Sequence, residues 1–303
     1  MDIRRLHAFA RIVDIGSITR ASSILHIAQP ALSQQIAALE THFGKPLLVR
    51  SKRGVVPTEA GKLLYRHCQM ILKQFDQAEL EIAASDESLS GLVTVGLAPL
   101  SLGSLVATQL IRAIRDEHPG IRLHVNENVG GGIISEMIMA GKVDIALIYD
   151  PGGIPGVEFS PIQTEELYFV TAEPLAVAEG GITLADAMQH PLILPDRIHT
   201  IRQVIDTTLS RAGLRANVVS QTESISILAG AMAEGTGATI LPYSAALAVE
   251  RRLPEASHYR IRKPNMKVNM AICVSAQLPL SEPAMIVRKR LTELAQEIAG
   301  GGQ

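Results

Sequence analysis

The segment of residues 17–61 constrains the fold of this chain most strongly. Within it, Leu32, Ile36, Leu39 and Phe43 recur at spacings of four, three and four residues, which is the apolar stripe of an amphipathic helix. The pattern predicts a helix whose stripe faces a core and whose opposite face is left for another partner.

The face opposite that stripe is small, polar and free of acidic side chains. At about 100° per residue it carries Pro30, Gln34, Ala37, Ala38 and Thr41, with Ser33 at its edge. A face that only keeps a protein in solution normally carries Lys and Glu. This one suits a negatively charged surface that presents hydrogen-bond donors and acceptors, and the major groove of DNA fits that description.

The residues before this helix predict a helix-turn-helix. Gly16 and Ser17 predict the end of a first helix at 3–13 and the N-cap of a second at 18–25. The second helix is expected to point Ile18, Ala21, Ile24 and Leu25 inward. About three residues of turn then lead to Pro30, which is the helix-turn-helix spacing.

The residues after it predict a wing. Residues 47–49 and 55–57 predict two short strands, joined by the basic glycine turn Arg50–Gly54. The cations of such a turn can reach the DNA backbone or the minor groove. Thr58 can cap the helix that follows.

Charge is distributed unevenly along the chain, although the net charge is only −2. Residues 1–75 hold 11 Lys and Arg against 4 Asp and Glu, whereas the remainder holds 17 against 26. A basic head on an acidic body indicates a nucleic-acid partner for the head alone.

A long helix is predicted from Glu59 to about Ala84. Its apolar residues step by 4, 3, 4, 3 and 4, which is a 3.5-residue period; they are Leu64, Cys68, Ile71, Phe75, Ala78 and Ile82. We interpret the stripe as a dimerising coiled coil formed by Leu64, Cys68, Ile71, Phe75 and Ile82. The alternative is a helix packed on its own domain.

Strands and helices alternate after a polar hinge at residues 85–91. Strands are expected at 92–97, 122–127, 144–148, 157–163, 167–171, 192–194, 217–221, 238–241 and 268–274, and helices at 102–117, 132–140, 184–188, 200–212, 225–234 and 283–298. In chain order, the first five of these elements are strand, helix, strand, helix and strand. This βαβαβ order predicts an α/β fold with a parallel, doubly wound sheet.

The head resembles the N-terminal domain of LysR-type transcriptional regulators. The resemblance is dense over residues 2–65 and rests on Gly16–Ala21, Leu25, Gln29–Ser33, Ile36, Leu39–Glu40, Gly44, Leu47, Arg50 and Pro57–Gly61. Leu48–Val49 departs from the Leu-Phe that the family more often has, which changes the packing behind the wing. More loosely, Gly96–Pro99, Ala140–Leu147 and Glu234–Pro242 resemble the effector domain of the same family.

The resemblance implies three parts. These are a winged helix-turn-helix DNA-binding domain at 1–58, a linker or dimerisation helix with a hinge at 59–90, and an effector-binding domain at 91–303. The last would have the two-lobed fold of periplasmic binding proteins, with lobe I at about 92–162 and 267–300 and lobe II at about 163–266. The chain would cross twice between the lobes, around a ligand cleft.

In the head, nine residues are expected to meet double-stranded promoter DNA. Ser33 and Gln34 would touch base edges, beside Gln29 and Pro30 at the start of the helix. Arg50 and Arg53 would contact phosphate or the minor groove, and Thr19, Arg20 and Lys52 would clamp the backbone. Arg50 has an alternative structural role, since it stands at the end of a strand.

In the body, ligands are expected beyond the carboxyl ends of the strands, where helix N-termini present free N–H groups. The turns there suggest a site for a small organic anion, made by Pro99, Ser101, Val129, Gly130, Gly131, His199, Thr200, Arg202, Thr222 and Ser224. Ser101, Thr200 and Ser224 serve equally well as helix caps. A regulator that needs no effector stays open.

Several classes of function lack their sequence signals. No dinucleotide fingerprint, phosphate loop, nucleophile elbow or paired catalytic carboxylates occur, so we expect no enzyme and no cofactor. The His residues show no metal-ligand spacing, so no metal site is assigned. The two cysteines, Cys68 and Cys273, are typical of reduced thiols in a cytoplasmic protein.

The N-terminus lacks the apolar core of a signal peptide. The uncharged run of residues 88–111 contains glycines and a proline, and is interpreted as strand, turn and helix instead of a membrane span.

These observations predict a cytoplasmic transcriptional regulator that binds DNA as a homodimer or homotetramer and acts on RNA polymerase. An effector, or its own abundance, would set its activity. The alternative is a small-solute-binding module with a basic head and no regulatory role on DNA.

Overall fold

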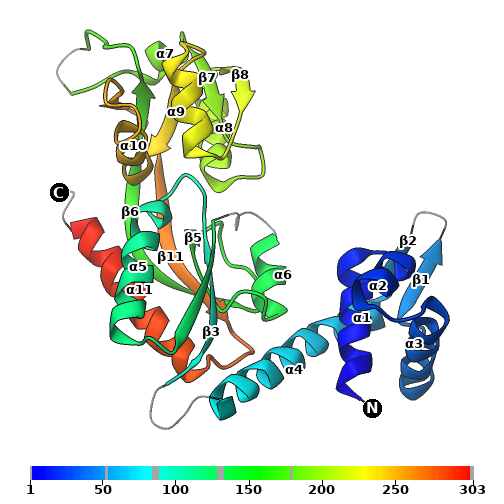
Figure 1. Ribbon diagram of the computed structural model, residues 1–303. Coiled ribbons are helices and arrows are strands. Elements are labelled where there is room, and N and C mark those ends of the chain that lie inside the picture. The colour runs from blue at the N-terminus through cyan, green and yellow to red at the C-terminus, as the bar shows by residue number, and fades with distance from the viewer. Residues whose placement is uncertain (1, 52–53, 84–88, 128–132, 178–179, 301–303) are drawn as a thin grey trace. The chain divides into compact units, whose positions relative to one another are not determined.

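The computed structural model describes residues 2–51, 54–83, 89–127, 133–177 and 180–300 (Figure 1). One compact unit comprises residues 1–87 with the short segment 139–142, and a second comprises residues 88–138 and 143–303.

The first unit, the head, is a helix-turn-helix with a wing. Its elements are α1 (Ile3–Ile15), α2 (Ile18–Leu25), α3 (Gln29–Phe43), β1 (Leu48–Ser51), β2 (Gly54–Pro57) and α4 (Glu59–Ala83). The order matches the sequence prediction. As expected, Gly16 ends α1 in the left-handed conformation, and the Ser17 side chain accepts from the Arg20 N–H to cap α2. Thr58 accepts from the Gly61 N–H and caps α4.

The apolar stripes meet in one small core. Leu32, Ile36 and Leu39 of α3 are fully buried there, together with Phe9 and Ile12 of α1. The first half of α4 completes this core. The same packing stabilises α4 itself, because a helix gains most of its stability from tertiary packing.

Two residues that were expected to point inward are exposed. Phe43 is 41% exposed because it is the last residue of α3, where its ring contacts the edge of His42 instead of the core. Ile24 is 59% exposed, since the inward face of α2 is formed by Ile18 and Ala21.

Gly54 lets the wing approach the turn between α1 and α2. The Val55 N–H donates to the Gly16 carbonyl at 2.8 Å, and a Cβ on Gly54 would lie 2.5 Å from that same oxygen. Gly54 also has φ +126°, which other residues rarely adopt. The contact fixes the start of β2, next to the turn of the wing, against the helix-turn-helix.

The second unit, the body, begins with a parallel sheet. Its first elements are β3 (Gly91–Leu97), α5 (Gly103–Glu117), β4 (Ile121–Asn126), α6 (Ile133–Met139) and β5 (Ile145–Tyr149). β3 pairs in parallel with both β4 and β5, as the βαβαβ order predicts. The last helix, α11 (Glu282–Gly300), packs beside α5 on one face of this sheet (Figure 1).

Two long antiparallel strands continue the sheet into a second lobe. They are β6 (Val157–Thr171) and β11 (Lys267–Ser275). β11 pairs with β5 and with β6 up to Glu166, and beyond that point β6 pairs with β9 (Thr239–Pro242) and β10 (Ser257–Arg260). The sequence suggested two separate strands at 157–163 and 167–171, and the structure joins them into one.

The second lobe also contains α7 (Leu184–Ala187), β7 (Pro191–Leu194), α8 (Thr200–Ala212), β8 (Asn217–Gln221), α9 (Ile225–Ala233) and α10 (Tyr243–Glu250). β7 and β8 are parallel. Helix α10 and strand β10 were not anticipated: α10 follows β9 directly, and no side chain forms a hydrogen bond that caps its start.

Most of the uncharged run at residues 88–111 is accounted for by β3, a turn and the first half of α5. Within the described ranges, every helix is too short or too polar to cross a membrane.

Candidate nucleic-acid interface and effector cleft

The outward face of α3 is exposed and carries no free acid. Gln29, Pro30 and Gln34 are exposed, whereas Ser33 is half-buried at the edge of the face. The Thr41 hydroxyl donates to the Ala37 carbonyl at 2.9 Å, so it is turned back on its own helix. The groups free to meet a partner are therefore concentrated in the first half of α3.

The one acid of α3 is removed from that face by the wing. Glu40 Oε1 accepts the backbone N–H of Leu47 at 2.8 Å and that of Leu48 at 3.2 Å. Both donors belong to buried residues at the start of β1. The carboxylate thus ties α3 to the wing and leaves the outer face without negative charge.

Helix α2 presents a second set of candidate contacts. Thr19 and Arg20 are both exposed in its first turn. The Thr19 carbonyl accepts the hydroxyls of Ser22 and Ser23, so these two hydroxyls are turned back on their own helix. Exposed residues in the first turn of α2 are suited to contact a phosphate backbone.

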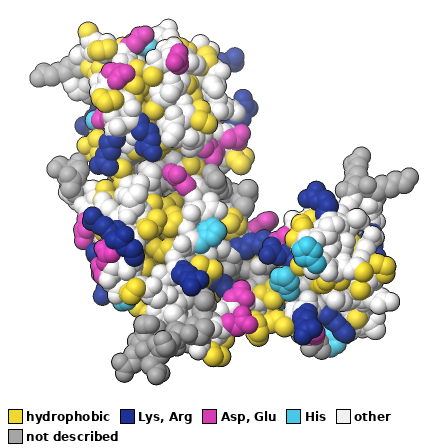
Figure 2. Space-filling view, viewed as in Figure 1, with side chains coloured by type: hydrophobic (Ala, Val, Ile, Leu, Met, Phe, Trp, Pro, Cys, Tyr) yellow, Lys and Arg dark blue, Asp and Glu magenta, His cyan; other side chains and the backbone are white. Residues whose placement is uncertain are grey.

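The wing supplies cations. Arg50 is exposed on β1, between Val49 and Ser51. Lys52 and Arg53, which were also expected to contact DNA, lie outside the described residues. The visible face of the head shows mainly Lys, Arg and His among its charged side chains (Figure 2).

The apolar stripe of α4 divides into two parts. Leu64 is only 9% exposed and Cys68 is fully buried, and both pack inside the head. Their role is therefore in the core of their own domain. Further along the helix, Ile71, Phe75 and Ile82 are 41%, 46% and 85% exposed. This second part is free to meet a partner chain.

In the body, the turn between β3 and α5 is tightly organised. Pro99, Leu100 and Ser101 are all buried, and Leu100 has φ +53°, a left-handed conformation that costs a residue other than glycine about 1–2 kcal/mol. The Ser101 hydroxyl donates to the Ala98 carbonyl at 2.6 Å and accepts from the Gly103 N–H at 2.9 Å. Ser101 thus holds the turn that leads into α5, whose N-cap is the next residue, Leu102.

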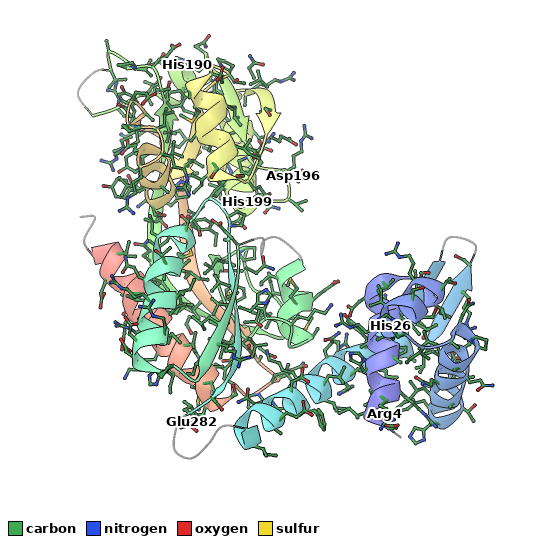
Figure 3. The ribbon with its side chains drawn as sticks, viewed as in Figure 1. Arg4, His26, His190, Asp196, His199 and Glu282 are labelled. Atoms are coloured by element: carbon green, nitrogen blue, oxygen red, sulfur yellow. The ribbon has the colours of Figure 1, made fainter. Side chains whose placement is uncertain are left out.

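His199 joins the two lobes. Its ring accepts the Ile201 N–H at 3.3 Å, which caps α8, and it also hydrogen-bonds the backbone of Pro99. Since Pro99 has no N–H, its carbonyl is the acceptor and the second ring nitrogen is the donor. Burial lowers the pKa of His199 to about 4, although the Pro99 carbonyl opposes this shift. Figure 3 shows His199 at the edge of its lobe.

The other polar residues of the second lobe cap helices or turns. The Ser224 hydroxyl accepts the Ile227 N–H at 3.3 Å and caps α9. The Thr222 hydroxyl accepts the Ser224 N–H at 3.2 Å. Thr200 is the half-buried first residue of α8. The structure brings Pro99 and His199 together, whereas Val129, Gly130 and Gly131 lie outside the described residues.

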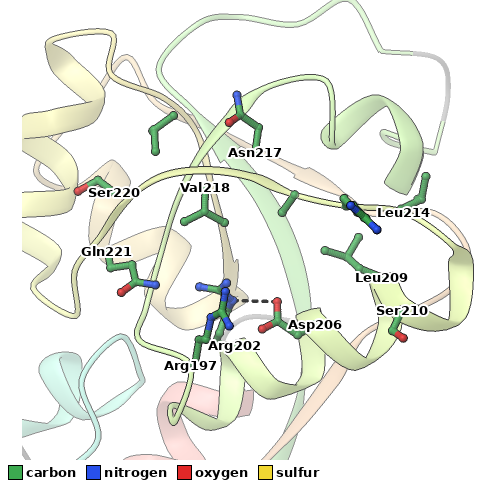
Figure 4. A pocket seen from close by; sticks show the side chains of 13 residues that line it. Arg197, Arg202, Asp206, Leu209, Ser210, Leu214, Asn217, Val218, Ser220 and Gln221 are labelled. Atoms are coloured by element: carbon green, nitrogen blue, oxygen red, sulfur yellow. Dashed lines mark hydrogen bonds and ion pairs between the residues drawn. The ribbon is translucent and has the colours of Figure 1, made fainter.

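Arg202 was expected to help bind an anion, but its guanidinium group is paired within its own lobe. Its Nε donates to Asp206 at 2.8 Å and its Nη1 to the Pro195 carbonyl at 3.2 Å (Figure 4). It lines a pocket of about 830 Å³ between α8 and β8, with Arg197 and Arg215 on the same wall. Sequence reasoning gave no sign of this pocket, because its residues gather only when β8 packs beside α8.

The two cysteines are buried, one in the head and one in the body. Burial raises the pKa of the Cys68 thiol to about 12 and raises that of Cys273 as well. A buried thiol that stays protonated is a poor nucleophile and a poor redox sensor. Across the residues with assigned positions, His, Cys, Asp and Glu form no cluster that could hold a metal ion.

Two family models together match nearly the whole chain. Residues 3–62 match the bacterial regulatory helix-turn-helix protein, lysR family, and residues 86–296 match the LysR substrate binding domain. The nitrogen assimilation regulatory protein nac of Klebsiella aerogenes is 38% identical over 97% of this chain and 95% of its own length. The Escherichia coli protein of the same name is 38% identical over 96% of this chain and 94% of its own length.

Solved structures share the fold. A full-length OxyR variant from Pseudomonas aeruginosa superposes with a TM-score of 0.68 at 21% identity and covers 98% of both chains. Full-length CbnR complexed with its target DNA gives a TM-score of 0.54 at 21% identity, over 97% of this chain and all of that one.

The predicted family, fold and class of function are thus confirmed. The helix-turn-helix match and the relatives that align over the full length count against a solute-binding module without a role on DNA. The chain belongs to the LysR family: it is a DNA-binding transcriptional regulator with an effector-binding domain, and not an enzyme.

Proposed function

We propose that this regulator binds promoter DNA in the cytoplasm by placing the first half of α3 in the major groove. Gln29, Pro30, Ser33 and Gln34 read base edges there. Thr19 and Arg20 hold the backbone beside α2, and Arg50, Lys52 and Arg53 of the wing contact phosphate or the minor groove.

The outer face of α3 carries this proposal. It is exposed, polar and acid-free, while Leu32, Ile36 and Leu39 of the opposite stripe are fully buried and Glu40 is held against the wing. An exposed amide such as Gln34 can pair with an adenine edge, which gives sequence preference. A face that only met solvent would gain nothing from withdrawing its one carboxylate.

The regulator acts as a homodimer, or as a homotetramer made from two dimers. The exposed part of α4, with Ile71, Phe75 and Ile82, is the contact that joins two heads at a fixed spacing. A two-fold pair of heads matches a palindromic DNA site, with one recognition helix for each half-site.

Activity is set where the two lobes of the body meet. The ring of His199 hydrogen-bonds the Pro99 carbonyl there, so the chain's own residues hold the lobes together, and either an effector or the abundance of the regulator sets its activity. A small organic anion at the N-terminus of α8, near His199 and Thr200, has to break that bond or add to it. Binding there changes the angle between the lobes and, through the oligomer, the DNA bend and the recruitment of RNA polymerase.

The deciding experiment is DNA binding by Gln34→Ala, compared on the chain's own upstream region and on a scrambled duplex. We expect a loss of about 1–3 kcal/mol on the upstream region and a much smaller loss on the scrambled DNA. Gln74→Ala, which removes the same exposed side chain from α4, serves as the matched control and should bind like the parent. Equal losses on both duplexes would show that Gln34 does not read sequence.

The proposed coupling has its own test. Footprints of the full chain are compared with and without a candidate organic anion. A footprint whose length is the same in both states would contradict the change in head spacing.

A further inference from the structure

A second pocket lies where β6 leaves its pairing with β11 and begins to pair with β9 and β10. We call it the hinge pocket. It has a volume of about 310 Å³ and is lined by residues of α5, β6, α10 and α11: Leu102, Leu105, Gln163, Thr164, Glu165, Glu166, Tyr168, Tyr243, Ser244, Leu247 and Ile298. The size falls at the lower end of small-molecule sites, which begin at about 300 Å³. α5, α10, α11 and β6 can be followed around this point in Figure 1.

A buried carboxylate is the main polar feature of the hinge pocket. Glu165 is only 5% exposed. Its Oε2 accepts the Ser244 N–H at 2.8 Å, at the start of α10, and its Oε1 accepts the Tyr149 hydroxyl at the long distance of 3.5 Å. The Gln163 side chain, on the wall of the same pocket, also interacts with this carboxyl group. Oε1 keeps the capacity to accept a further hydrogen bond.

A buried hydroxyl lies beside it. Ser244 is 5% exposed, and its Oγ lies close to Glu165 and Tyr149 without a hydrogen bond of good geometry to any described residue. Buried polar atoms are almost always paired, and an unpaired one at the wall of a pocket indicates a site for a ligand or water. A role limited to holding the N-terminus of α10 explains only Oε2.

The side chains of the hinge pocket that can carry a charge near neutral pH are both acids, and burial raises the pKa of one of them, Glu165, so a cation beside it would favour its charged form. The other acid, Glu166, is already paired with Arg260 at 3.0 Å and with Lys267 at 3.7 Å, both of which are more than half exposed. The pocket lining contains no Lys or Arg, and no ion pair is found for Glu165 among the described side chains. A buried carboxylate without a cation is costly, so a cationic ligand is the partner that stabilises it most.

Aromatic and aliphatic side chains complete the pocket. The ring centroids of Tyr168 and Tyr243 lie 5.4 Å apart, with 50° between the ring planes, and the His258 ring makes a T-shaped contact with each. Tyrosine ring faces attract ammonium groups. Opposite them, leucines of α5 and α10 and an isoleucine of α11 provide apolar surface for a short carbon chain.

We propose that the hinge pocket binds a small organic ammonium ion, a primary or methylated amine on a short aliphatic chain. The ammonium group lies against Glu165 Oε1 and the Ser244 hydroxyl, beside the two tyrosine rings. This site is separate from the His199 cleft and holds whether or not α3 reads DNA as proposed. Because β6 carries Glu165 from one lobe into the other, occupancy also bears on the angle between the lobes.

The test uses the full chain and three probes of equal length that differ only in their head group: n-butylammonium, n-butyrate and 1-butanol. Isothermal titration calorimetry and thermal unfolding measure binding. We expect n-butylammonium alone to bind and to raise the midpoint of thermal unfolding. Binding of n-butyrate or 1-butanol as tight as that of n-butylammonium would overturn the proposal.

Glu165→Gln removes the charge but keeps an oxygen that can accept the Ser244 N–H. We expect it to weaken n-butylammonium binding about tenfold or more, because a hydrogen bond to a charged group contributes about 1.5–3 kcal/mol. Glu158→Gln makes the same change at an exposed position of β6 outside the pocket and should bind like the parent. An unchanged affinity in Glu165→Gln would refute the site.

Tyr168→Leu is an independent variant in case Glu165→Gln does not fold. It keeps the charge and removes one half-buried ring, and we expect it to weaken n-butylammonium severalfold and to weaken tetramethylammonium more. DNA binding by the parent protein without amine is measured in parallel. This measurement tests the DNA-binding function of the head by itself. Loss of DNA binding and loss of amine binding are therefore separate results.

Discussion

Glu40 of the recognition helix accepts the backbone N–H of Leu47, which lies seven positions further along the chain at the root of the wing, at 2.8 Å. The same carboxylate oxygen accepts the N–H of Leu48, and both donors are buried. Glu40→Ala leaves two buried N–H groups without a partner. We expect it to lower the free energy of unfolding by about 1–3 kcal/mol and to weaken DNA binding, since the wing loses its anchor.

Urea unfolding of the full chain and a gel shift on the upstream region measure the two effects. Glu59→Ala is the control, because Glu59 is an exposed acid whose ion pair with Lys62 is itself exposed, and it should leave both quantities nearly unchanged. A stability of Glu40→Ala equal to that of the parent would mean that water replaces the carboxylate freely.

Arg50 tests the division between reading bases and holding phosphates. The side chain is exposed on β1, so Arg50→Ala should not unfold the head. We expect weaker binding to cognate and scrambled duplexes alike. The slope of log binding constant against log salt concentration should become smaller in magnitude by about one. Binding measured from low to moderate salt gives the slope. A loss confined to the cognate duplex would assign Arg50 to base reading instead.

The head could be predicted from its sequence almost residue by residue because its signals are local. Caps such as Ser17 and Thr58, the glycine at position 16 and the stripe of α3 each depend on neighbours within a few positions. The errors at Ile24 and Phe43 arose at helix ends, where periodicity continues but the core does not. The acid-free face was also visible in the sequence, although the reason for it, the bond from Glu40 to the wing, was not.

The body could be predicted less completely because its site depends on contacts between distant segments. Helix boundaries such as 200–212 and strand 217–221 were reproduced. The sequence could not show that Arg202 would be paired with Asp206, or that Ser101 would use both of its hydrogen bonds within its own turn. The contact of His199 with Pro99 spans one hundred positions, and no pattern in the chain indicates it.

Substitutions at the two ends of the apolar stripe of α4 should affect different properties, namely the stability of the head and the association of two chains. Leu64 is buried in the head, so Leu64→Ala should lower the free energy of unfolding by about 2–4 kcal/mol and leave the association constant little changed. Phe75→Glu places a charge on an exposed apolar position, so it should weaken dimerisation with little effect on the stability of the head. Sedimentation equilibrium and urea unfolding separate the two quantities. Dimerisation unaffected by Phe75→Glu would place the interface on another surface.

His199 makes the stability of the body depend on pH. Burial lowers its pKa to about 4 in the folded protein, against about 6.5 in an unfolded chain. Between these values the unfolded state binds more protons, so the contribution of His199 is fully present above pH 6.5 and is lost as the pH falls toward 4. At about 1.4 kcal/mol for each pKa unit, the loss approaches 3 kcal/mol.

The variant His199→Asn isolates this contribution. Asparagine can still cap α8, but it does not titrate and is too short to reach the Pro99 carbonyl. Unfolding free energies of the parent and the variant should converge as the pH falls from 6.5 to 4. His124→Asn, at an exposed position of β4, should run parallel to the parent. Parallel curves for His199→Asn would mean that the ring is free to take up a proton in the folded state, and hence that the contact between the lobes opens without cost.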